Sequence, residues 1–328
     1  MGTVTAPSPD VPSGAKRAKR VQRKIVRRIV DGVLLLDKPQ GLSSNHALQT
    51  ARRLLNAAKA GHTGTLDPMA SGLLPLTFGE ATKFSQMLLD ADKTYEAVVQ
   101  LGVETDSGDA EGAVIATHPV AVAEAQLGEV LARFRGEIDQ VPPMYSALKR
   151  DGKALYEYAR EGVELERAPR RVTIHALDLL DFAGERFSLR VSCSKGTYIR
   201  SLAMDIGTAL GCGAHLCGLR RTRIGSFEVG DAVSLDRIEA TAENERDALL
   251  APVDALVSEF PAVVLDVEQE GWLLQGRTLR LSSPGSAGPV RAYGPQGFLG
   301  LAQWQPDGAL APKRLIATGA GVAISASA

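Results

Sequence analysis

The chain has 328 residues, of which 45% are hydrophobic and 23% charged, so it has the composition of an ordinary globular protein and the length for two domains. No segment is apolar over the length of a membrane span, and no apolar signal-peptide core follows the N-terminus. Three cysteines leave an odd thiol in any disulfide scheme, which is typical of a reducing compartment. We therefore expect a cytoplasmic protein that does not enter a membrane.

The formal net charge of −1 hides a basic segment at the N-terminus. Residues 1–31 contain eight basic and two acidic residues, so this segment carries +6 and the remainder of the chain −7. Such runs mark nucleic-acid contact about as often as they mark a solvated tail. Because the segment is rich in Pro, Ser and Gly, we expect residues 1–31 to form a basic, largely disordered arm, with order beginning near Gly32.

After the arm, the apolar run 33–36 predicts a buried strand that ends in the turn 37–41. Ser43 can cap a helix that leads to residues 61–72, Gly-His-Thr-Gly-Thr-Leu-Asp-Pro-Met-Ala-Ser-Gly. The glycines of this segment allow close approach to a ligand, and Pro68 places the Asp67 carboxylate on a stiff backbone. A surface Asp-Pro turn is the simpler interpretation, and the segment alone does not exclude it.

Residues 79–88 predict a helix with Phe84, Met87 and Leu88 facing inward. From residue 95 to 103 every second residue is apolar or aromatic, which predicts a half-buried strand. The acid-rich residues 105–112 lack the spacing of a calcium loop, so we expect a polar hairpin loop there.

Residues 121–135 predict an amphipathic helix, 144–149 a strand and 155–160 a short helix. A second alternating strand is predicted over 187–193, and if the alternation continues past Gly196, Tyr198 and Arg200 share its polar face. A helix follows and ends at Gly211. Residues 241–260 indicate a boundary, beyond which short apolar runs separated by Gly and Pro predict a small all-β domain.

The residue types limit the chemistry. The spacing of Cys212, His215 and Cys217 is too tight for a zinc site and a fourth ligand is missing, so we expect no metal. Hydride transfer is not indicated, because no dinucleotide fingerprint is present. A carboxylate on a stiff loop can act as nucleophile, general base or electrostatic stabiliser, and an adjacent arginine would keep it ionised. An aromatic ring beside it could stack on a nucleobase.

Five blocks of sequence together resemble one known family. They are residues 61–72, 79–83 (Gly-Glu-Ala-Thr-Lys), 93–95 (Lys-Thr-Tyr), 145–149 (Tyr-Ser-Ala-Leu-Lys) and 194–200 (Ser-Lys-Gly-Thr-Tyr-Ile-Arg). In this order, over about residues 32–225, they resemble the TruB family of bacterial tRNA pseudouridine synthases. One block would be weak support, whereas five in order are specific.

The resemblance implies an α+β fold, with a mixed, mainly antiparallel central sheet flanked by helices and a small all-β C-terminal domain of the PUA type. It divides the chain into the arm 1–31, a catalytic domain 32–250 and a C-terminal RNA-binding domain 251–328. The implied reaction is isomerisation of the T-loop uridine of tRNA, uridine-55, to pseudouridine by base flipping, without cofactor or metal. The implied partner is the tRNA T-arm stem-loop, bound by a monomer that needs no guide RNA or protein partner.

The match also implies roles for individual residues. Asp67 corresponds to the catalytic nucleophile and Arg200 to the arginine that pairs with it. Four residues correspond to substrate-binding positions, namely His62 on the flipped nucleotide, Tyr95 stacked on the target base, Tyr198 beside it and Leu219 lining the base pocket. Lys38, Lys195, Arg220 and Arg221 are candidate phosphate contacts, since RNA loops are bound largely through backbone charge.

Two other interpretations remain. Guide-RNA-dependent, dyskerin-like pseudouridine synthases share the Asp loop, but the short C-terminal domain of this chain favours a stand-alone enzyme. Residues 61–64, Gly-His-Thr-Gly, could instead be the G-x-x-G backbone clamp of a non-catalytic RNA-binding module. Such a clamp joins two helices, and the residues 65–68 that follow are poor helix-starting sequence.

Overall fold

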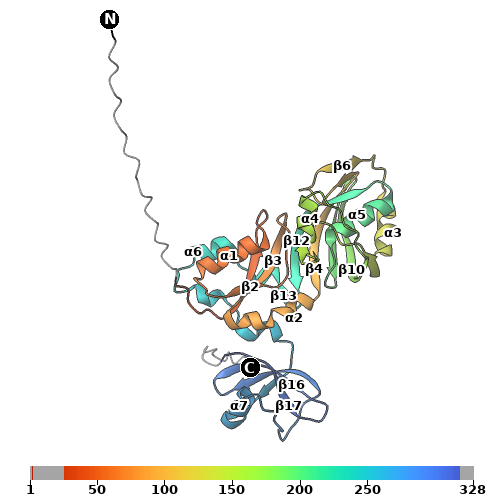
Figure 1. Cartoon of the computed structure of the whole chain (residues 1–328). Helices are drawn as coiled ribbons and strands as arrows, with labels where there is room; N and C mark the ends of the chain where they lie inside the picture. Colours follow the sequence, from red (N-terminus) through yellow and green to blue (C-terminus); the bar gives the residue numbers. More distant parts are fainter. Residues whose placement is uncertain (1, 3–25, 318–328) are drawn as a thin grey trace.

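A central mixed sheet organises the computed structural model, which describes residue 2 and residues 26–317 (Figure 1). Within these residues the sheet has nine strands in the order β1-β3-β12-β4-β11-β10-β7, with β2 paired to β3 and β13 to β12. Among the strands of this sheet, only β12 and β3 pair in parallel. The strands are β1 (Gly32–Lys38), β2 (Ala60–His62), β3 (Ala70–Phe78), β4 (Lys93–Leu101), β7 (Gly136–Gln140), β10 (Arg170–Ala183), β11 (Arg186–Cys193), β12 (Ala214–Ile224) and β13 (Phe227–Glu228). The prediction of a mixed, mainly antiparallel sheet is confirmed.

The alternation of side chains in β4 gives the sheet two different faces. Tyr95, Ala97 and Val99 are buried on one face, as the sequence predicts. Thr94 and Glu96 point to the other face, where they line an open cleft of about 480 Å³. The apolar face carries the main core, to which four helices contribute: α1 (Ser44–Leu54), α3 (Glu124–Arg133), α5 (Ile199–Leu210) and α6 (Leu235–Ala240).

Short elements connect the strands. Two small hairpins are formed by β5 (Val103–Thr105) with β6 (Val114–Thr117) and by β8 (Lys149–Arg150) with β9 (Lys153–Ala154). The remaining helices of this part are α2 (Ser85–Asp90) and α4 (Leu155–Arg160), with 3-10 helices η1 (Gly79–Phe84), η2 (Val229–Asp231), η3 (Arg246–Leu249) and η4 (Val253–Val257). Ser43 caps α1, as predicted, by accepting a hydrogen bond from His46 N. No helix in the described residues is long and apolar enough to cross a membrane.

The C-terminal part is a four-stranded sheet with one helix (Figure 1). It consists of β14 (Ala262–Val264), α7 (Val267–Leu274), β15 (Gly288–Gly294), β16 (Gly297–Trp304) and β17 (Leu310–Leu315). The sequence analysis did not identify α7, which begins with a capping box between Asp266 and Gln269. Phe298, Leu301 and Ile316 pack in one cluster with Leu73 and Phe84 of the larger part.

Charged groups of η1 reinforce this contact. Lys83 Nζ donates to Leu315 O at 2.9 Å and lies 2.6 Å from Glu80 Oε2. The same Glu80 oxygen accepts a hydrogen bond from Ala317 N at 2.7 Å. Two residues of the Gly-Glu-Ala-Thr-Lys block therefore hold the end of the C-terminal sheet.

Three predictions about local structure are wrong. Residues 144–148 are bends and irregular chain rather than a strand, and only Lys149 belongs to a strand, β8, because Ser146 O and Leu148 O accept hydrogen bonds from residues 156 and 155. Met87 is 37% exposed, since only Phe84 and Leu88 of that turn face the core. The alternation of β11 does not continue past Gly196, and Arg200 lies on α5.

The predicted basic arm falls mostly outside the described residues. Its last residues, 26–31, are described. The backbone of Arg28 forms an isolated β-bridge with Ala57, and its side chain forms an ion pair with Asp247, in which Nη1 and Oδ2 are 2.6 Å apart. Arg27 Nη1 donates to Ala57 O at 3.2 Å. Order therefore begins before Gly32, and these two arginines bind the protein itself.

Candidate active site

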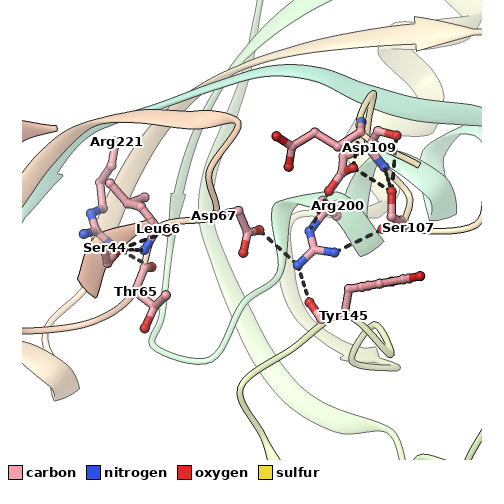
Figure 2. A network of polar contacts seen from close by, with 10 residues as sticks. Ser44, Thr65, Leu66, Asp67, Ser107, Asp109, Tyr145, Arg200 and Arg221 are labelled. Atoms are coloured by element: carbon pink, nitrogen blue, oxygen red, sulfur yellow. Dashed lines mark hydrogen bonds and ion pairs between the residues drawn. The ribbon is translucent and has the colours of Figure 1, made fainter. Parts of the chain in front are cut away.

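The Asp67 carboxylate lies on a loop whose backbone is fixed on both sides. Before Asp67, the hydroxyl of Ser44 accepts from Leu66 N at 2.8 Å and donates to Leu66 O at 2.9 Å. After it, Gly41 N donates to Pro68 O at 2.7 Å. The Asp67 side chain is 38% exposed, so it remains accessible to a substrate (Figure 2).

Arg200 approaches Asp67 from the opposite side. Its Nη2 lies 3.0 Å from Asp67 Oδ2, and its guanidinium is only 4% exposed. Nη1 donates to Ser107 O at 3.1 Å and Nη2 to Tyr145 O at 2.6 Å, so two backbone carbonyls also hold the guanidinium in place (Figure 2). The predicted pairing of Arg200 with Asp67 is thus present in the geometry, although Arg200 reaches it from a helix.

A second carboxylate lies at this site, that of Asp109, which was not predicted from the sequence. Its Oδ2 lies 3.5 Å from Arg200 Nε, and its side chain is 6% exposed. Ser107 Oγ donates to Asp109 Oδ1 at 2.6 Å, and Glu111 N donates to the same oxygen at 3.1 Å. The acid-rich loop 105–112 was visible in the sequence, but nothing there separates Asp109 from its exposed neighbours.

The electrostatics of the site are set by two carboxylates facing one cation. Burial raises the pKa of Asp67, Arg200 opposes this shift, and Asp109 reinforces it, with a net increase above the ordinary value. Burial, Asp109 and Asp67 likewise raise the pKa of Glu111. Arg200 therefore favours the ionised form of Asp67 against the effects of burial and of Asp109.

The predicted aromatic residues lie near this carboxylate. Tyr95 is 9% exposed on β4, and Tyr198 precedes α5, where its N–H donates to Gln140 Oε1 at 2.8 Å. Burial is the main cause that raises the pKa of both hydroxyls, and Asp67 raises both further, so both rings lie within its electrostatic reach. Leu219 is half-buried on β12, opposite Ala97 of β4.

His62 ends β2, where burial lowers its pKa and favours the neutral imidazole. Its Nδ1 is buried without a hydrogen-bond partner among the described residues.

The four candidate phosphate contacts divide into two groups. Lys38 and Arg221 are 0% and 1% exposed, so neither offers its charged group on the surface of this structure. The Lys38 ammonium donates to Pro39 O and Leu42 O, and burial lowers its pKa to about 8. Lys195 and Arg220 are accessible, but each is paired with an acid, Asp90 at 2.9 Å and Asp37 at 2.8 Å respectively.

No group of three or more His, Cys, Asp or Glu side chains in residues 26–317 is arranged to hold a metal ion. The His215 ring is occupied by Val103 O, 2.9 Å from Nδ1. Cys217 Sγ lies 3.9 Å from Nε2 of the same ring, so the two side chains are in contact without a third ligand beside them in the described residues.

The fold of this chain is that of the Cbf5 pseudouridine synthases, as two solved complexes show. The archaeal box H/ACA sRNP Nop10-Cbf5 complex matches with a TM-score of 0.62 and 28% identity over 84% of this chain and 79% of that chain. A Cbf5-Nop10-Gar1 complex matches with a TM-score of 0.62 and 30% identity over 83% and 78%.

Sequence comparison defines the family within this class. Residues 52–199 match the N-terminal domain of TruB family pseudouridylate synthases, residues 200–258 the C-terminal domain of tRNA pseudouridylate synthase B, and residues 261–316 the C-terminal domain of pseudouridine synthase II TruB. The chain belongs to the TruB family of pseudouridylate synthases and is an isomerase.

Several relatives cover almost the whole chain. The tRNA pseudouridine synthase B of Azoarcus sp. is 68% identical over 92% of this chain and 100% of its own length. That of Aromatoleum aromaticum is 66% identical over 89% and 94%.

Proposed function

We propose that this enzyme converts the T-loop uridine of tRNA, uridine-55, to pseudouridine with Asp67 as nucleophile. The observation that carries the proposal is the ion pair between Asp67 and Arg200, in which Oδ2 and Nη2 are 3.0 Å apart. The loop that carries Asp67 is fixed on both sides of this residue. The names of the relatives support tRNA as the substrate.

The site supplies what this reaction needs. The bond between uracil N1 and the sugar C1′ breaks, the base rotates, and a bond between C5 and C1′ forms. N1 gains a proton and C5 loses one to solvent, so no oxidant or cofactor is consumed. Before this, the uridine has to leave its stack, which costs roughly a few kcal/mol. Stacking on an aromatic ring such as Tyr95 offsets about 1–3 kcal/mol of that cost.

The test is release of tritium from transcribed tRNA labelled at uracil C5. We expect release from tRNA that carries the T-loop uridine and none from a matched transcript with cytidine at that position. Release that is unchanged by this substitution would show that another uridine is the target.

A guide-RNA-dependent synthase is the second candidate, because the Cbf5 chains that match this fold come from complexes with other components. The same assay distinguishes the two. Turnover by the purified chain with tRNA alone supports the stand-alone enzyme, whereas turnover only after addition of a guide RNA or protein supports the alternative.

We also propose that RNA is bound beyond the active site, by the basic arm and by the C-terminal region 251–328. Charge supports the first, since residues 16–24 contain six basic residues and no acid. Deleting residues 1–25 keeps Arg27 and Arg28 in place and should weaken tRNA binding and flatten its dependence on salt. Equal affinity of both chains at several salt concentrations would remove the arm from the proposal.

A further inference from the structure

Arg221 is a buried cation without an acidic partner in the described part of the chain. Its side chain is 1% exposed, and Nη2 has no hydrogen-bond partner there. It lies on β12, opposite Gly72 of β3 and Tyr95 of β4. Burying a guanidinium without a carboxylate is unfavourable, so its remaining contacts require an explanation.

Those contacts are two backbone carbonyls on either side of Asp67. Arg221 Nε donates to Leu73 O at 2.8 Å, and Nη1 donates to Thr65 O at 3.5 Å. Because the guanidinium is planar and rigid, its short bond to Leu73 O and its longer contact with Thr65 O together restrain the separation of the two ends of the loop. Ser44 holds the same loop through Leu66, and Figure 2 shows Ser44 and Arg221 together on the side of Asp67 that faces away from Arg200.

Gly72 shows that the loop end and β12 are in direct contact. Its φ is +100°, and a Cβ at this position would lie 2.3 Å from Arg221 O and 2.8 Å from Arg221 N. No side chain other than hydrogen fits between the two strands here. The backbone from Asp67 into β3 therefore has little freedom to move relative to Arg221.

We propose that Arg221 is a positioning residue for the reaction, which fixes the backbone that carries Asp67 by binding the carbonyls of Thr65 and Leu73. The inference rests on the proposed role of Asp67 as nucleophile. Arg221 acts through the loop and does not touch the substrate. Its loss therefore lowers kcat and leaves KM unchanged, in contrast to the loss of a phosphate contact, which raises KM.

The test compares Arg221→Lys and Arg221→Gln with the wild type in steady-state tritium release. Lysine keeps the charge but cannot bridge both carbonyls, so both variants should lose about tenfold to a hundredfold in kcat, the cost of misplacing a reacting group by about 1 Å. KM should stay within about twofold, because substrate contacts are retained. Arg190→Lys is the control, since Arg190 is 52% exposed and pairs with Glu96 on the other face of the sheet.

Chemical rescue separates positioning from general loss of structure. Methylguanidinium at low millimolar concentration should restore part of the kcat of Arg221→Ala, but none in Asp67→Asn. All rates are normalised to the folded fraction, measured by circular dichroism.

Three results would overturn the positioning role: normalised kcat of the Lys and Gln variants within about twofold of wild type, a rise in KM at constant kcat, or a loss of rate that matches the unfolded fraction. Turnover by Asp67→Asn would instead refute the proposed function, whatever Arg221 does.

Discussion

Nη2 of Arg200 lies 3.0 Å from Asp67 Oδ2, while Nε of the same guanidinium lies 3.5 Å from Asp109 Oδ2. One buried cation thus faces two carboxylates from different loops. Asp109 is the more buried of the two acids, and Asp67 the one that a substrate can reach. A change in any of the three side chains should therefore alter the protonation or the orientation of the others.

Asp67→Asn should fold and bind tRNA but lose turnover by roughly a thousandfold or more, because the amide is not a nucleophile. Its stability at neutral pH should equal or exceed that of the wild type. The pKa of Asp67 is raised in the folded protein, so ionisation of this group destabilises the fold above its unfolded value of about 3.9. Tritium release, filter binding and thermal unfolding measure the three properties, and retained turnover would falsify the assignment.

Arg200→Ala should lower both activity and stability. It leaves Asp109, at 6% exposure, without its cation, and removal of one partner from a buried pair costs about 3 kcal/mol or more. Arg200→Lys keeps the positive charge but loses part of the guanidinium donor set, so its activity and stability should lie between those of Arg200→Ala and the wild type. Urea unfolding and tritium release test this, and near-wild-type values for Arg200→Ala would exclude the ion pair as a functional element.

Asp109→Asn should shift the pH dependence of the reaction. The Asp109 charge raises the pKa of Asp67, and without it Arg200 faces Asp67 alone, so both effects lower that pKa. Since Asp67 acts when ionised, the acidic limb of the kcat/KM profile should move to lower pH. Asp307→Asn is the control, because Asp307 pairs with Arg280 on the surface. If the acidic limb of the Asp109→Asn profile stays at the wild-type pH, the proposed effect of Asp109 on the pKa of Asp67 is contradicted.

Glu80→Gln should weaken the attachment of the C-terminal sheet by about 1 kcal/mol, the contribution of an ordinary hydrogen bond. Burial would raise the pKa of Glu80, but hydrogen bonds from Lys83 and Ala317 N outweigh it and lower the pKa. The stabilisation is therefore present above the unfolded value of about 4.3 and is lost as pH falls through the lower folded value. The difference in unfolding free energy between variant and wild type should be present at pH 7 and shrink in acid. An equal difference at both pH values would exclude a contribution from the charge.

The sequence predicted local structure best where a short-range pattern determines the outcome. The alternation around Tyr95 identified β4 and its buried face, and Ser43 identified the start of α1. In both cases the determining neighbours lie within a few residues. Asp67 differs, because its own segment left a surface Asp-Pro turn open and only the resemblance of five ordered blocks singled it out.

The same reasoning failed where distant residues decide the outcome. Arg221 and Lys38 were taken as surface cations because basic residues are usually exposed, and their partners are carbonyls elsewhere in the chain. The sequence held one indication that Arg221 is buried. Arg221 is two residues from Leu219 on the same strand, so the two side chains share one face of β12. Asp109 offered no such signal, because its burial depends on Arg200 from another element.

The contacts that fix the Asp67 loop also determine when it can form. Arg221 is 148 residues from Leu73 and 156 residues from Thr65, and Arg200 is 93 residues from Ser107. Contacts at such separation close late in folding. During synthesis, the Asp67 loop leaves the ribosome long before β12, so an incomplete chain lacks the geometry for catalysis. Activity therefore arises only once most of the central sheet has been made.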